Sequence, residues 1–219
     1  MKQLRERFKK FGGEFIPDIV EYLKEYTSQN PNVTISVGCD SVQKKRKTLY
    51  AVTIMLYNED FKNGAHVVFF RQNIHKVRDN FERLQKEVQL IQEVTEFLQS
   101  ELENFYVRKD LSLMERKKYK FHLNKCNGEY NHLPNMNEYE FTKNILLNDH
   151  EITQDYKLVD IHIDFNPFEG KSDSRGYSVN KSNLSYKSFV PWLRGLGYRV
   201  WAKPKAYAAS SAADLLLQD

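Results

Sequence analysis

The first strong pattern along the chain is an alternation of apolar and polar positions between residues 34 and 40. In this stretch, TISVGCD, the side chains of Ile35, Val37 and Cys39 alternate with polar or very small ones. A period of two is typical of a β-strand, with Asp40 at its end. Two further apolar stretches, LYAVTIMLYN and AHVVFFRQNI, follow after short turn-rich segments. The sequence therefore predicts three consecutive antiparallel strands.

The connection between the first two of these strands, QKKRKT at residues 43–48, is strongly basic. Such a turn is usually a solvated loop, and the alternative is a contact with phosphate.

Two helices are predicted from apolar positions that recur every three or four residues. The first, IPDIVEYLKEY, precedes the strands and has Pro17 in its first turn. The second, DNFERLQKEVQLIQEVTEFLQSEL, has Asp79 or Asn80 as its N-cap and a continuous apolar stripe. At about 100° per residue, Glu87 falls at the edge of that stripe, whereas the helix's other central glutamates point away. Glu87 is therefore expected to border the core.

Regular alternation returns in KLVDIHIDFNP, which predicts a fourth strand with Asp160, His162 and Asp164 on one face. A helix is predicted in LSYKSFVPWLRGLG, with a kink or a late start caused by Pro191 and with Gly197 as its cap. YRVWAKP predicts a fifth strand and AYAASSAADLLLQ a last helix. The order of elements indicates an α/β fold, in which helices flank a mixed five-stranded sheet.

Residues 105–156 interrupt this order, with a basic stretch RKKYK, a turn-rich stretch NKCNGEYNHLPN and a short predicted helix. We interpret them as an insertion or small subdomain within a single domain that spans residues 1–219. RKKYK is either a solvated helix face or a contact for nucleic acid, because it interleaves cations with an aromatic residue.

Composition narrows the class of protein. The 219 residues have a formal net charge of +4, 41% hydrophobic residues and only two cysteines, Cys39 and Cys126, which lie far apart. Disulfide frameworks and zinc knuckles are thereby excluded, and a reducing compartment is indicated. No apolar stretch is long enough for a signal peptide core or a membrane span. We expect a cytoplasmic protein without a membrane partner.

Four acidic residues fall on four different core elements: Asp40, Glu87, Asp164 and Asp214. Taken singly, Asp40 could cap a turn, Glu87 could pair with a neighbouring cation, and Asp214 could face solvent. Asp160 shares a strand face with Asp164, so either of these two could be the member of a salt bridge. His162, on that same face, is expected to be a packed sheet residue rather than a ligand.

Gathered carboxylates would repel one another unless a cation neutralised them. Oxygen ligands suit Mg²⁺ or Mn²⁺, and a pair of such ions can support phosphodiester cleavage. The four acids together therefore indicate metal-dependent hydrolysis of phosphodiester bonds.

This order of acids on strand, helix, strand and terminal helix resembles the ribonuclease H superfamily. More closely, the stretches ISVGCDS, HIDFNP, WLRGLGY and KPKAYAASSAAD resemble the YkuK-like family of ribonuclease H-related nucleases. The resemblance covers residues 34–104 and from Leu158 onward. It implies that Asp40 bridges two metal ions and that Glu87, Asp164 and Asp214 complete their ligand sets.

The same resemblance implies a nucleic-acid substrate, which could be RNA, DNA or their hybrid. Additional contacts to the substrate, or to the residues that hold the metals, are expected from a group of polar and basic residues: Ser41, Lys171, Arg175, Lys203, Lys205 and Ser210.

Two other functions compete with the nuclease. Sugar kinases and actin-like ATPases share the general fold, but they use glycine-rich phosphate loops, and this chain has 9 glycines and no such loop after its first strand. A non-catalytic nucleic-acid-binding module on the same fold is the second alternative.

Overall fold

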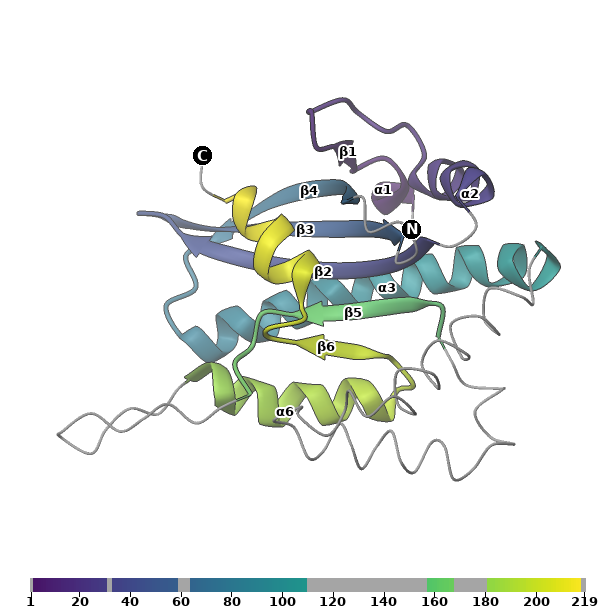
Figure 1. Cartoon of the computed structure of the whole chain (residues 1–219). Helices are drawn as coiled ribbons and strands as arrows, with labels where there is room; N and C mark the ends of the chain where they lie inside the picture. The colour runs from purple at the N-terminus through teal and green to yellow at the C-terminus, as the bar shows by residue number, and fades with distance from the viewer. Residues whose placement is uncertain (1, 31–32, 59–63, 110–156, 168–180, 218–219) are drawn as a thin grey trace, which may run out of the picture.

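The centre of the fold is a mixed sheet of six strands in the order β1-β4-β3-β2-β5-β6 (Figure 1). The computed structural model describes residues 2–30, 33–58, 64–109, 157–167 and 181–217. The predicted antiparallel strands are β2 (Val33–Gln43), β3 (Lys47–Asn58) and β4 (Ala65–His75). β5 (Val159–Ile163) lies parallel to β2, and β6 (Val200–Ala202) lies parallel to β5. A mixed α/β sheet with three antiparallel strands is thus confirmed.

The sheet has one strand more than the five that the sequence predicts. The additional strand, β1 (Lys9–Lys10), pairs antiparallel with β4 at Phe69 and Val68. A two-residue strand is too short to show a period of two, so the hydrophobic pattern alone could not reveal it.

Two predicted boundaries are also wrong. β2 does not end at Asp40 but continues to Gln43, because β3 pairs with it as far as Thr48. Helix α3 (Asn80–Lys109) continues into the segment predicted as an insertion at residues 105–156. The rest of that segment, including RKKYK, lies outside the described residues.

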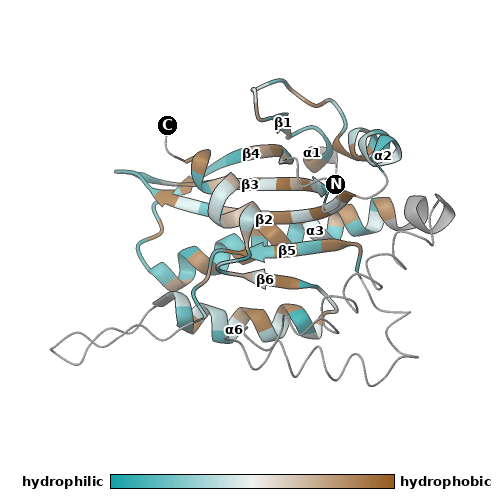
Figure 2. Ribbon diagram, in the orientation of Figure 1, coloured by the Kyte–Doolittle hydropathy of each residue, from teal (hydrophilic) through white to brown (hydrophobic). Residues whose placement is uncertain are grey.

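Helices cover both faces of the sheet. α3 packs against β2 and β5 and contacts α2 (Ile19–Gln29) and α6 (Lys181–Gly195). On the opposite face, the short π-helix η2 (Ala208–Ala213) packs against β2, β3 and β5 (Figure 1). Hydrophobic and hydrophilic residues alternate along α3 and α6, as expected for helices with one face on a sheet (Figure 2). The four-residue helix α1 (Lys2–Arg5) contacts α2.

Local capping follows the sequence closely. Asp79 accepts a hydrogen bond from the Glu82 backbone N–H, 2.9 Å away, and so caps α3. Asp18, not Pro17, sets the start of α2, because its Oδ1 accepts from the backbone N–H groups of Val20 and Glu21.

The predictions for the two ends of α6 have different outcomes. Gly197 has a φ of +83°, as a glycine cap after α6 requires. α6 itself does not start late, because it begins at Lys181 and includes Pro191. Within the described residues, no helix is long and apolar enough to cross a membrane.

Candidate carboxylate site

Asp40 and Asp164 are neighbours because of the register between β2 and β5. Cys39 pairs with Ile163 at the last position of this parallel ladder, so the next residue on each strand is an aspartate. Both carboxylates therefore lie at the carboxyl end of β5, and both are partly buried. The side chains of Cys39 and Ile163 themselves are fully buried in the core.

Asp214 is brought to this end of the sheet by the close packing of η2 on β2. A Cβ atom on Gly38 would lie 2.5 Å from the Ala208 carbonyl carbon and 2.5 Å from the Ala209 nitrogen, so only glycine fits there. Two hydrogen bonds fix the same helix turn. The Ala208 N–H donates to Nδ1 of His162 at 3.1 Å, and the Thr53 hydroxyl donates to the Ala208 carbonyl at 2.7 Å.

Asp214 itself follows the last residue of η2, and its side chain is exposed. The position of this third carboxylate thus depends on a glycine, a threonine and a histidine of the sheet.

Glu87 approaches from the other face of the sheet, on α3. Its side chain is 1% exposed, and its Oε1 accepts a 2.5 Å hydrogen bond from the Ser41 hydroxyl. Arg83, one helix turn earlier, lies 3.5 Å from the Glu87 carboxylate and donates to both the carbonyl and the hydroxyl of Ser41. Because adjacent residues of a strand point to opposite faces, Ser41 connects Glu87 to the strand that carries Asp40.

The four carboxylates influence one another electrostatically. Burial, together with the charges of Asp164 and Asp214, raises the pKa of Asp40 to about 6, although the Ser41 backbone N–H acts against this shift. Burial, and then the charge of Asp40, raises the pKa of Glu87 well above its usual value. Burial also raises the pKa of Asp164, and Lys203 opposes that effect while Asp214 adds to it. The cluster therefore resists carrying its full negative charge.

The donor chemistry of the cluster suits a hard cation, but its side chains are not gathered around one point. Oδ1 of Asp164 is buried and has no hydrogen-bond partner among the described residues, which is unusual for a carboxylate oxygen. Carboxylate oxygens are the ligands that Mg²⁺ and Mn²⁺ prefer. Among the described residues, however, no three acidic, histidine or cysteine side chains are placed to hold a metal ion. Ion binding would therefore need the carboxylates to draw closer together.

The choice between Asp160 and Asp164 is clear from their partners. Asp160 is 4% exposed and forms a bidentate ion pair with Arg199, at 2.5 and 2.7 Å from Nη2, and it also accepts from Trp201. Both carboxylate oxygens of Asp160 are thus engaged by Arg199 and Trp201. Asp164 lies 3.0 Å from the half-exposed ammonium of Lys203 and keeps its second oxygen without a partner.

The remaining predicted residues lie in different surroundings. Lys205 is exposed, and its ammonium lies 5.8 Å from the centre of the Trp201 ring. The Ser210 hydroxyl donates to the carbonyl of Ala206, which precedes η2. Ser41 is buried and serves Glu87, as described above. Lys171 and Arg175 lie outside the described residues.

Two residues that position the site were not singled out from the sequence: Gly38 and Thr53. Gly38 carried a usable signal, because a glycine inside a strand often marks the close approach of another backbone. The hydrogen bond from Thr53 to a helix 155 residues later has no local signature.

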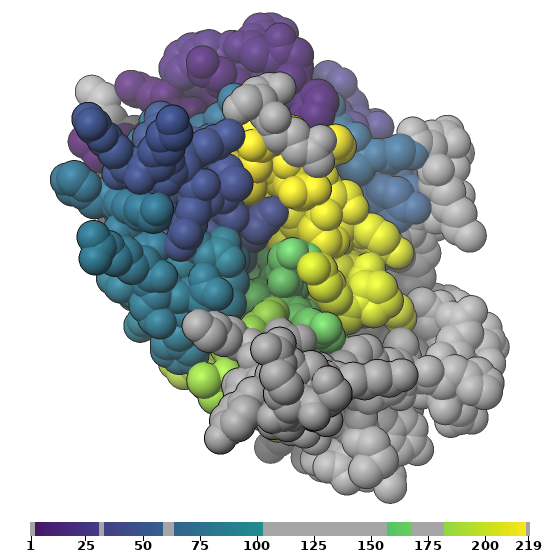
Figure 3. All heavy atoms as spheres, turned by 90° about the vertical axis from the view of Figure 1, so that its left-hand side faces the viewer, coloured from purple at the N-terminus to yellow at the C-terminus, as the bar shows by residue number. Residues whose placement is uncertain are grey.

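The end of β5 is visible between other segments on one side of the molecule. Figure 3 shows the green residues of β5 and its following turn, with the yellow C-terminal segment on one side and the teal residues of β4 and α3 on the other. Parts of the chain that lie far apart in sequence thus meet at the carboxylate site.

A mixed sheet that brings carboxylates from two strands and two helices to one end is the frame of ribonuclease H-like proteins. The family model described as "Ribonuclease H-like" matches residues 14–126, just over half of the 219 residues. The chain therefore belongs to the ribonuclease H-like family. This match includes Asp40 and Glu87 and ends before Asp164 and Asp214. No curated protein and no solved structure matches the chain.

Proposed function

We propose that this protein is a metal-dependent nuclease that hydrolyses phosphodiester bonds in nucleic acid. The observation that carries the proposal is the buried Oδ1 of Asp164, which has no partner among the described residues, beside Asp40, whose pKa is raised by burial and by the charges of Asp164 and Asp214. Membership of the ribonuclease H-like family supports a nucleic-acid substrate. The stretches that resemble the YkuK-like family support a place for the chain within that group.

The carboxylates would hold two ions, Mg²⁺ or Mn²⁺. When bound, such a pair supplies an activated water and stabilises the leaving oxygen. Asp40 lies between Asp164 and Glu87 in the electrostatic cluster, which suits a ligand shared by both ions. Asp164 and Glu87 would each complete one ligand set, and the exposed Asp214 would serve at the solvent side.

The neighbouring residues have separate roles in this proposal. Ser41 and Arg83 hold Glu87 in place through the hydrogen bonds described above. The Lys203 ammonium neutralises Asp164 and is exposed enough to turn toward a phosphate. Lys205 lies close to it and could contact the same strand of substrate.

The test is cleavage of a labelled panel of RNA, DNA and hybrid duplexes in Mn²⁺, compared with the same reactions in EDTA. Asp40→Asn should abolish cleavage, because it removes the charge at the centre of the cluster. Glu93→Gln is the matched control, since it removes an acid on the exposed face of α3. Cleavage that persists unchanged in Asp40→Asn would contradict the proposal.

A non-catalytic nucleic-acid-binding module is the second candidate. It is favoured by the finding that no three potential ligands in the described part of the chain are yet placed to hold an ion. Calorimetric titration with Mn²⁺ separates the two candidates, because such a module should show no Mn²⁺ affinity that depends on Asp40.

A further inference from the structure

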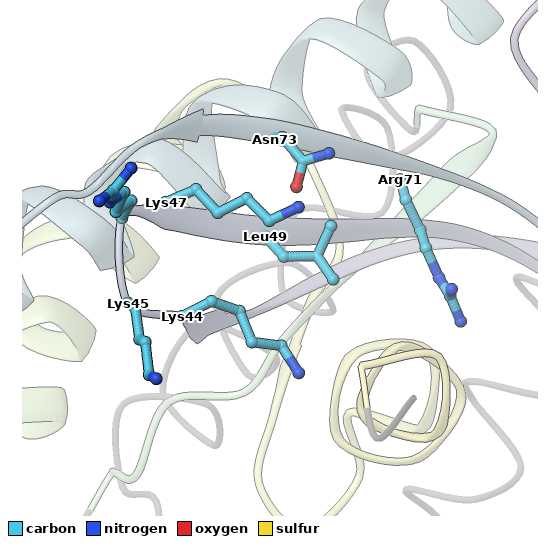
Figure 4. A pocket seen from close by; sticks show the side chains of 7 residues that line it. Lys44, Lys45, Lys47, Leu49, Arg71 and Asn73 are labelled. Carbon is cyan, nitrogen blue, oxygen red and sulfur yellow. The ribbon is translucent and has the colours of Figure 1, made fainter.

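A basic pocket lies at the β2–β3 hairpin, apart from the carboxylates. It has a volume of about 820 Å³, and its lining includes five cationic residues and Asn73. Lys44, Lys47, Arg71 and Asn73 gather around Leu49 in Figure 4, and Lys45 and Arg46 complete the charged set. Four of the five cations are consecutive in the hairpin, and the fifth comes from β4.

The hairpin that forms most of this pocket carries a concentration of positive charge. No acidic residue occurs between positions 41 and 58 or between positions 65 and 78. Lys45, Arg46 and Lys47 are exposed, and none of them forms an ion pair with another described residue. A concentration of like charge of this kind destabilises the folded state slightly, and it attracts anions.

The pocket lies on the same face of the sheet as Asp40. Asp40 pairs with Ala51 on β3, and Ala51 pairs with Arg71 on β4, so these three residues form one row across the strands. Directly paired residues point to the same face. With strands about 4.8 Å apart, the Cα atoms of Asp40 and Arg71 are separated by about 10 Å. Lys44, directly after the end of β2, is four residues beyond Asp40, or about 13 Å.

We propose that this hairpin pocket binds the phosphodiester backbone of a nucleic-acid duplex a few nucleotides from the carboxylates. The inference rests on the proposed function, because it adds a substrate contact to the same site. A duplex strand carries one phosphate per about 3.4 Å of helix axis, so 10 to 13 Å corresponds to about three or four nucleotides. The pocket would fix the position of the strand without reading its sequence.

The lining argues for a duplex backbone rather than for unpaired bases. Its residues are cations, one amide and one leucine, with no aromatic ring on which a splayed base could stack. An anionic membrane surface would also attract the hairpin. It is less suitable, because the same face carries the acidic cluster about 10 Å away, which a membrane would repel.

The experiment measures DNA binding without cleavage. Fluorescence anisotropy of a labelled duplex of about 20 base pairs is followed in EDTA from about 50 to about 200 mM KCl. The test variant is the triple Lys45→Gln, Arg46→Gln and Lys47→Gln. The control triple, Lys9→Gln, Lys86→Gln and Lys187→Gln, removes the same net charge from other elements. Thermal unfolding verifies that both variants fold as the wild type does.

The hairpin triple should weaken binding at least about tenfold and lower the slope of log affinity against log salt by about 2 to 3, since each phosphate contact contributes about 0.9. The control triple should keep the wild-type slope. Equal losses in the two triples would overturn the inference. So would a hairpin triple that binds DNA normally but no longer binds phosphatidylserine vesicles.

The binding experiment tests the hairpin pocket separately from the proposed nuclease activity. Salt-dependent binding that requires the hairpin supports the inference even when Mn²⁺ produces no cleavage. A wild type that cleaves, beside a hairpin triple with unchanged binding, would overturn the pocket's role alone.

Discussion

Replacing Asp40 with asparagine should stabilise the metal-free protein and remove its response to Mn²⁺. The pKa of Asp40 is raised from 3.8 to about 6, chiefly by burial. A group with a raised acidic pKa is harder to ionise in the folded state than in the unfolded state, so its negative charge destabilises the fold at neutral pH. Asparagine has nearly the same shape and no charge.

The size of the effect follows from the pKa difference. A shift of about two pKa units, at about 1.4 kcal/mol each, gives an upper value of about 3 kcal/mol. The destabilisation is fully present above pH 6, falls as the pH decreases from 6, and is absent below the unfolded pKa of 3.8. We therefore expect a gain of about 1 to 3 kcal/mol for Asp40→Asn at pH 7.5, and about a third of it at pH 4.5.

Thermal unfolding in EDTA measures this gain. For a chain of this length, 1 kcal/mol corresponds to about 2 to 4 °C in Tm. Added Mn²⁺ should also raise the Tm of the wild type. At a concentration of one hundred times Kd, a bound ion adds about 2.7 kcal/mol to the free energy of unfolding. Mn²⁺ should not raise the Tm of Asp40→Asn.

Glu93→Gln serves as the control. It should change neither the Tm in EDTA nor the rise in Tm with Mn²⁺, because Glu93 lies on the exposed face of α3. The reasoning would be refuted if Asp40→Asn lowered the Tm in EDTA, or if Mn²⁺ stabilised the variant as much as the wild type.

Two further predictions concern the anchoring of η2. Gly38→Ala should destabilise the protein by about 1 to 3 kcal/mol and reduce Mn²⁺ affinity, because its Cβ would displace Ala208 and move Asp214. Gly195→Ala, where a Cβ meets nothing within 4 Å, is the control for chemical unfolding, and equal effects of the two changes would contradict the packing argument. Burial lowers the pKa of His162 from 6.5 to about 4, so its stabilising contribution is complete above pH 6.5 and is lost as the pH falls toward 4, by up to about 3 kcal/mol. His162→Asn should therefore flatten the dependence of unfolding free energy on pH in this range. An unchanged slope would contradict the claim that His162 is responsible for this dependence.

The regular part of the fold was predictable because its hydrophobic periods are long. The alternation through β2 and the stripe along α3 each persist over enough residues to define the element and its buried face. The mixed character of the sheet also followed, since a crossover helix before a later strand indicates a parallel strand. The two-residue β1 and the extension of β2 past Asp40 depend on pairing with distant strands, and no local pattern specifies such pairing.

The sequence could predict which acidic residues form the candidate site, but it could not predict the contacts that hold their side chains in place. The proximity of Asp40 and Asp164 follows from the ends of adjacent parallel strands, which sequence reasoning could place. The sequence favoured Asp164 but left Asp160 as its rival, because the partner that separates them, Arg199, lies on a different part of the chain. The approach of Glu87 from the opposite face, through Ser41, likewise depends on tertiary packing.

The acids of this site cannot relieve their repulsion by moving apart, because the backbone sets their positions. Asp40 and Asp164 follow paired strand residues, and η2 is held against β2 at Gly38. Ser41, Arg83, Lys203, protonation or an added cation can reduce the charge conflict. The basic hairpin lies on the same face, with the Cα atoms of Asp40 and Arg71 about 10 Å apart. This face therefore carries charges of opposite sign, with the carboxylates suited to cations and the hairpin suited to phosphates.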